Sequence, residues 1–97
     1  MEYYVLSLRW TVGEDYITFW RPNNSGYTTD INQAGRYSQE AIINNPTYYD
    51  DCKTTLAVPC EEVEQWVWRV IHSDNLKKLL EPRGIKYQDI LEAKVRG

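Results

Sequence analysis

The sequence predicts an α+β fold in which a small antiparallel sheet packs against one main amphipathic helix, with short additional helices at the C-terminus. The first observation is a period-two run of β-forming residues near 3–10, followed by three shorter β-rich runs at 16–21, 27–29 and 54–58. The second is that apolar residues adopt a sustained helical spacing only after residue 60. The 97 residues are enough for a single domain, 1–97, with one core.

The first two strands are expected to form a hairpin. Alternate side chains of the first strand fall on one side at period two, namely Tyr4, Leu6, Leu8 and Trp10. Val12–Asp15 is a turn, and the second strand, 16–21, ends at Pro22, which cannot donate to a ladder. The turn residues 22–26 then return residues 27–29 onto the second strand.

The middle of the chain reads as short elements with clear boundaries. Asp30 is expected to cap a single helical turn that ends at Gly35. Ser38 is expected to cap a helix over 39–44, which Pro46 stops. Residues 47–53 read as a polar loop before the short strand 54–58.

The main helix is predicted over 61–72, covering the sheet. Its apolar stripe has spacings of three and four residues and consists of Val63, Trp66, Val67, Val70 and Ile71. A further helical piece starts at Ser73 or Asp74 and carries Leu76, Leu79 and Leu80, before Pro82 and Gly84 break it. A last helix from about Tyr87 uses Ile90, Leu91 and Val95.

No catalytic motif is present, and the chain is expected not to be an enzyme. The single histidine, His72, falls at the end of the predicted main helix, where the last carbonyls favour a cation. Asp50 and Asp51 read as a solvated loop rather than an acid–base pair. Cys52 and Cys60 are expected to be ordinary thiols, with one disulfide as the alternative. Neither a metal site nor a cofactor is predicted, because zinc needs about four ligands at short spacing.

Charge and hydropathy indicate which partners and which cellular location to expect. The net charge is −3, and basic residues gather after residue 68, where acidic residues interleave with them. This pattern is typical of solvated helix faces, so a nucleic-acid partner is not expected. No apolar run is long enough to span a membrane, and the N-terminus lacks the pattern of a signal peptide. We therefore expect a cytoplasmic protein without a membrane partner.

A candidate binding surface lies at the end of the predicted hairpin. The residues that could bind a partner are Trp20, Arg21, Asn23, Asn24, Tyr27, Arg36 and Tyr37. Arg stacks on aromatic rings and grips phosphate or carboxylate, and Asn amides recognise hydrogen-bonding edges. In the alternative interpretation Trp20 covers the core, Arg21 pairs with a nearby acid and the Asn residues only shape the turn.

The same region resembles small hypothetical proteins of bacteriophages and prophages. The residues that carry the likeness are the stretches 3–8, 17–27, 34–37 and 56–60, which read YYVLSL, ITFWRPNNSGY, AGRY and LAVPC. It covers roughly the first 60 residues. The resemblance implies a phage setting, hence the cytoplasm of a host cell, and it carries no activity or catalytic residue with it.

Three functions follow as hypotheses. The first is a non-enzymatic phage-type accessory protein that binds and blocks a host protein, including a host-defence protein, as anti-CRISPR proteins do. The second is a protein that binds or sequesters a small, nucleotide-like ligand. The third is a nucleic-acid-binding accessory factor or a minor enzyme. The sequence gives no indication of the oligomeric state.

Overall fold

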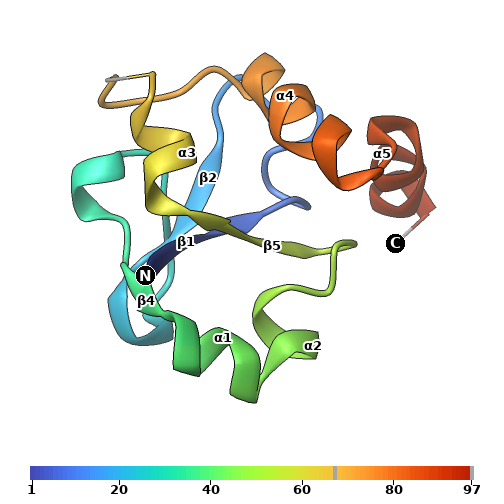
Figure 1. Ribbon diagram of the computed structural model, residues 1–97. Helices are drawn as coiled ribbons and strands as arrows, with labels where there is room; N and C mark the ends of the chain where they lie inside the picture. Colours follow the sequence, from blue (N-terminus) through green and yellow to red (C-terminus); the bar gives the residue numbers. More distant parts are fainter. Residues whose placement is uncertain (67, 97) are drawn as a thin grey trace.

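The sheet is built around the first strand of the chain. The computed structural model describes residues 1–66 and 68–96. Its strands are β1 (Glu2–Ser7), β2 (Thr18–Trp20), β3 (Tyr27–Thr28), β4 (Tyr37–Ser38) and β5 (Thr55–Pro59). Its α-helices are α1 (Gln39–Asn44), α2 (Pro46–Tyr49), α3 (Cys60–Glu64), α4 (Leu76–Leu80) and α5 (Tyr87–Arg96) (Figure 1). Single 3-10 turns lie at Pro22–Asn24, Ile31–Gln33, Ser73–Asn75 and Glu81–Arg83.

Every strand pairing is antiparallel. Along one edge of β1, β5 pairs with residues 3–7. The other edge is shared, because β4 pairs with residues 2–3 of β1 and β2 pairs with residues 6–7. Strand β3 extends the sheet beyond β2. The predicted α+β fold with a small antiparallel sheet is therefore confirmed, with one strand, β4, that the sequence pattern did not indicate.

Helices cover both faces of this sheet (Figure 1). The larger core lies under α3 and α4, where alternate β1 side chains meet Phe19, Leu56 and Val58 from the neighbouring strands. The opposite face carries a second cluster under α1 and α2, consisting of Val5, Trp20, Tyr37, Ile42, Tyr49 and Ala57. Two-sided burial explains why the short strands are apolar on both faces rather than alternating with polar residues.

Several local predictions are confirmed. Strands β1 and β2 pair as expected, and Tyr27–Thr28 returns onto β2. The Asp30 carboxylate accepts a hydrogen bond from the Asn32 N–H at 2.9 Å and begins the predicted single turn. The Ser38 hydroxyl accepts one from the Ala41 N–H at 3.1 Å and caps α1. These boundaries follow from side chains that satisfy the first free N–H groups of a helix.

The predicted main helix over 61–72 is wrong in length. Helix α3 ends at Glu64, and the chain continues without helix through the described residues up to His72. Ile71 is fully buried, but from an extended segment in which its carbonyl accepts a hydrogen bond from the Ile17 N–H at 2.8 Å. Val70 is exposed, and Val67 lies outside the described residues. Pairing with residues 15–17 thus overrides the helical spacing.

Two further predictions in the first half of the chain are also wrong. The first strand ends at Ser7 rather than near residue 10, so Trp10 lies beyond it and is half exposed. The predicted loop 47–53 begins inside α2, which buries Tyr49. Pro46 starts this helix as well as ending α1, because its fixed φ and missing N–H suit a first helical position.

In the C-terminal half, Leu76, Leu79 and Leu80 are buried as predicted, and Ile90 anchors α5. Val95 does not contribute, since 78% of it is exposed. His72 does not end a helix. It precedes a 3-10 turn, and its Nδ1 accepts a hydrogen bond from the Asp74 N–H at 3.1 Å.

Candidate functional site

Aromatic side chains surround a depression on the α1–α2 face of the sheet. A hollow of about 330 Å³ and a smaller one of about 160 Å³ share Trp20, Tyr27 and Tyr48 in their walls. We call the two together the aromatic groove. Trp10 and Arg9 complete the larger hollow with four hydroxyl side chains, those of Ser7, Thr47, Thr54 and Thr55. Asn24 and Gly26 complete the smaller one. Among the described residues, the groove thus combines planar rings, hydrogen-bonding groups and the Arg9 side chain.

Trp20 forms the floor of the aromatic groove. It is only 8% exposed, whereas Trp10, Tyr27 and Tyr48 are 49%, 50% and 54% exposed. Its ring packs edge-on against Tyr48 at a centroid distance of 5.2 Å and against Tyr27 at 6.4 Å. Among the described residues its indole N–H is the buried side-chain polar atom without a hydrogen-bond partner. Such an orphaned donor costs about 1–3 kcal/mol, so it is uncommon in a purely structural position.

The turn that contains Asn23 and Asn24, at one end of the groove, is stabilised by hydrogen bonds with the buried side chain of Tyr37. Asn23 and Asn24 have φ angles of 57° and 58°, in the left-handed region that Asn tolerates better than most residues. The buried Tyr37 hydroxyl donates to the Arg21 carbonyl at 2.5 Å and accepts from the Asn24 N–H at 3.1 Å. Gly35 permits this approach, because a Cβ there would lie 2.9 Å from the backbone of Pro22. The predicted residues Asn24 and Tyr37 therefore meet at this turn.

Arg21 holds the same hairpin closed. Its Nε donates to the Tyr27 carbonyl at 3.0 Å, and its backbone N–H donates to the Gly26 carbonyl at 2.8 Å. Neither Arg21 nor Asn23 is among the residues that line the groove. The structure thus gives both residues a role in shaping the turn that presents Tyr27.

Arg36 lies apart from the groove, toward the opposite face. Its guanidinium pairs with Glu2 at 2.9 Å and with Glu64 at 2.7 Å, and it donates to the Tyr4 hydroxyl at 3.0 Å. Burial, aided by the hydrogen bond to Glu64, raises the pKa of Tyr4 to about 12. Tyr4 and Glu64 also line a hollow of about 430 Å³ beside Arg69. Because Arg36 pairs with Glu64 and Asp30 pairs with Arg69, this hollow offers a ligand few charged groups without a partner.

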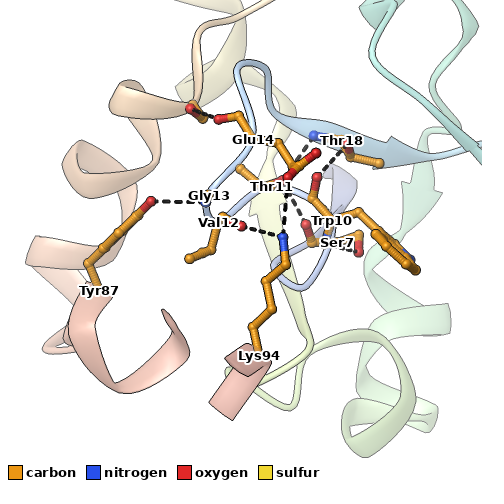
Figure 2. Close-up of polar contacts among 10 residues, drawn as sticks. Ser7, Trp10, Thr11, Val12, Gly13, Glu14, Thr18, Tyr87 and Lys94 are labelled. Atoms are coloured by element: carbon orange, nitrogen blue, oxygen red, sulfur yellow. Dashed lines mark hydrogen bonds and ion pairs between the residues drawn. The ribbon is translucent and has the colours of Figure 1, made fainter. Parts of the chain in front are cut away.

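Sequence reasoning missed Arg9 and Trp10, which a tight turn presents to the groove. The turn is fixed by hydrogen bonds from the Trp10 N–H to the Ser7 hydroxyl at 3.2 Å and from the Thr18 hydroxyl to the Trp10 carbonyl at 3.2 Å. From α5, Lys94 donates to the Val12 carbonyl at 2.5 Å. Figure 2 shows the Trp10 indole pointing away from these contacts. The sequence pattern did not show that the first strand stops at Ser7, and Arg9 and Trp10 were therefore placed within it.

The segment 50–55 contributes Thr54 and Thr55 to the lining of the groove. Asp51 is not merely solvated, because its carboxylate accepts hydrogen bonds from the backbone N–H groups of residues 53, 54 and 55 at 2.7–2.8 Å. Burial raises its pKa, but these bonds and one from the Thr54 hydroxyl outweigh that effect and lower the pKa to about 2. Asp50 likewise accepts from the Ala57 N–H. Both carboxylates therefore organise the loop that carries Thr54 and Thr55.

The described residues contain no cluster of three or more His, Cys, Asp or Glu side chains that could hold a metal ion. Cys52 and Cys60 are both free thiols, and burial raises the pKa of each, to about 11 for Cys60. Over the part of the chain that the structure describes, none of the helices has the length and apolar character needed to cross a bilayer.

Comparisons of the chain with protein-family models, with curated proteins and with solved structures found no match. The resemblance to phage proteins accordingly stays a hypothesis, and the geometry of the groove is the feature that bears on function.

Proposed function

We propose that this chain is a non-enzymatic binding protein of phage type that captures a nucleotide-like ligand in the aromatic groove. The observation that carries the proposal is the composition of the groove, in which Trp10, Trp20, Tyr27 and Tyr48 surround one hollow whose remaining lining is largely hydroxyl groups and Arg9. A planar base can stack on such rings, and base–aromatic stacking contributes about 1–3 kcal/mol per base. The hydroxyl groups and Asn24 supply donors and acceptors for its edge.

The size of the groove agrees with this class of ligand. Its larger hollow, about 330 Å³, lies at the lower end of the range of about 300–1,000 Å³ typical of small-molecule sites. At about 0.3 kcal/mol per non-hydrogen atom, a ligand of about 20 such atoms would bind with about 6 kcal/mol, or a dissociation constant of tens of micromolar. The orphaned Trp20 N–H would gain an acceptor if the Tyr48 ring moved aside for the ligand.

Isothermal titration calorimetry with the four ribonucleoside 5′-monophosphates tests the proposal. Wild-type protein should bind at least one of them saturably, and Tyr48→Ala should weaken that binding about fivefold or more, since one stacked base contributes about 1–3 kcal/mol. Tyr16→Ala is the matched control, because Tyr16 is a similarly exposed tyrosine that lines neither hollow of the groove. No binding at millimolar concentrations, or equal losses in both variants, would contradict the proposal.

Blocking of a host protein is the second candidate. It is favoured by the three half-exposed rings at the rim, because Trp, Tyr and Arg dominate the hot spots of protein interfaces. Affinity capture from host lysate separates the two functions. Capture of one host protein by wild type but not by Tyr48→Ala, with no nucleotide binding by either, would favour the blocking function over ligand capture.

A further inference from the structure

A hollow of about 420 Å³ lies between α5 and the loop that precedes β5 (Figure 1). The loop contributes Cys52 and Lys53 to its lining, and residues 84–86 together with α5 form the rest. Among the described residues, the hollow shares no lining residue with the aromatic groove. It is therefore a separate space, which the function proposed above does not use.

The apolar part of this lining lies at the edge of the main core. Ile90 on α5 is 4% exposed, and Ile85 and Cys52 pack, partly buried, against the same core cluster. Ala93 follows Ile90 by three residues, so both lie on one side of the helix. Hydrocarbon that covers these side chains would lose contact with water, which is the main source of affinity for an apolar ligand.

Two lysines line the same hollow and leave their ammonium groups available to an anion. Lys53 and Lys86 are both exposed, and over the part of the chain that the structure describes neither side chain takes part in a hydrogen bond, ion pair or ring contact. Asp89 is the single carboxylate among the described lining residues, so two positive charges meet one negative charge there. The carboxylates of the loop compete little, because Asp50 and Asp51 accept hydrogen bonds from backbone N–H groups.

We propose that this hollow binds a small aliphatic carboxylate, such as a fatty acid of medium chain length. The hydrocarbon chain would lie against Ile85 and Ile90, and the carboxylate would lie beside Lys53 and Lys86. A neutral apolar molecule would leave the two ammonium groups unused, and an inorganic anion would leave the apolar lining unused. The volume lies within the range of about 300–1,000 Å³ typical of small-molecule sites.

Hydrogen bonds hold the walls of the hollow in place. On α5, the Lys94 ammonium donates to the Val12 carbonyl at 2.5 Å, and the Tyr87 hydroxyl accepts from the Gly13 N–H at 3.3 Å (Figure 2). The loop is held by the hydrogen bonds that the Asp51 carboxylate accepts from backbone N–H groups. Walls that are already fixed reduce the ordering cost of binding.

Isothermal titration calorimetry with hexanoate, octanoate and octan-1-ol tests the proposal. Octanoate should bind wild type saturably, and about fivefold or more tightly than hexanoate, because each buried methylene group is worth up to about fourfold in affinity. Octan-1-ol, which has the same chain without the charge, should bind about fivefold more weakly than octanoate. Lys86→Ala should weaken octanoate binding about threefold and leave octan-1-ol binding unchanged. Lys78→Ala, which removes an exposed lysine of α4 that does not line the hollow, should change neither.

Blocking the hollow shows where the chain binds. Ala93→Trp should fill the space and reduce octanoate affinity about tenfold or more. Glu92→Trp, at a neighbouring exposed position that does not line the hollow, should leave the affinity unchanged. No saturable octanoate binding at millimolar concentrations, equal affinity for octanoate and octan-1-ol, or unchanged affinity in Ala93→Trp would each overturn the proposal. Equal losses in the two tryptophan variants would show that octanoate binds elsewhere and would overturn it as well.

Discussion

Removing one hydroxyl group, in Tyr37→Phe, should destabilise the turn that supports the aromatic groove. The Tyr37 hydroxyl bridges the Arg21 carbonyl and the Asn24 N–H, at 2.5 and 3.1 Å, and Tyr37 is 9% exposed. Phenylalanine keeps the ring packed against Tyr49 but leaves both backbone groups without this partner. Both hydrogen bonds are only partly buried, and an intramolecular hydrogen bond contributes about 0.5–1.5 kcal/mol, so we expect a loss of about 1 kcal/mol.

The effect should be measured by thermal and urea denaturation followed by circular dichroism. In a domain of this size 1 kcal/mol corresponds to a change in Tm of roughly 4–8 °C, so Tm should fall by about that amount. Tyr48→Phe is the matched control, because its hydroxyl makes no hydrogen bond to any other described residue and the side chain is half exposed. A Tyr37→Phe protein as stable as wild type would refute the argument that this hydroxyl holds the turn.

Three further changes test other parts of the structure. Arg36→Ala should lower stability by only about 1 kcal/mol or less, because the ion pairs of Arg36 are partly exposed. It should also leave nucleotide affinity unchanged, because these ion pairs lie away from the groove. A tenfold loss of affinity measured by calorimetry would show that the ligand binds on the face that carries Arg36 and not in the groove. Leu6→Ala should cost about 2–5 kcal/mol in urea unfolding, since Leu6 is fully buried, whereas Val95→Ala should have almost no effect. The lowered pKa of Asp51 means that its carboxylate stabilises the fold above its unfolded pKa of about 3.9 and loses that contribution as pH falls toward about 2. The decline in Tm between these pH values should therefore be smaller in Asp51→Asn than in wild type, and an identical decline would contradict this role.

Local signals predicted the sheet and several short elements correctly. The alternation in β1, the turn residues after β2, and the caps at Asp30 and Ser38 each act within a few residues, so the sequence shows them directly. The prediction of the main helix was wrong because the conformation of this segment depends on a contact between distant parts of the chain. Its apolar spacing is real, but Ile71 is buried by pairing with a segment more than fifty residues earlier, which no local pattern reveals.

The candidate site was predicted in part. Trp20, Asn24 and Tyr27 line the groove, and Tyr37 supports it, because all four belong to one hairpin or pack directly beneath it. Arg9, Trp10 and Tyr48 come from separate segments that only the folded sheet brings together. Arg36 is only one residue from Tyr37, yet its side chain belongs to the other face, since neighbouring residues of an extended chain point in opposite directions.

The indole N–H signals of the four tryptophans provide the most direct test of the groove as a ligand site. In a ¹H–¹⁵N correlation spectrum recorded during titration with a ribonucleoside 5′-monophosphate, the Trp10 and Trp20 signals should shift saturably. The Trp66 and Trp68 signals should stay in place, since neither residue lines the groove. Unchanged Trp10 and Trp20 signals at millimolar nucleotide, or shifts confined to Trp66 and Trp68, would contradict the account.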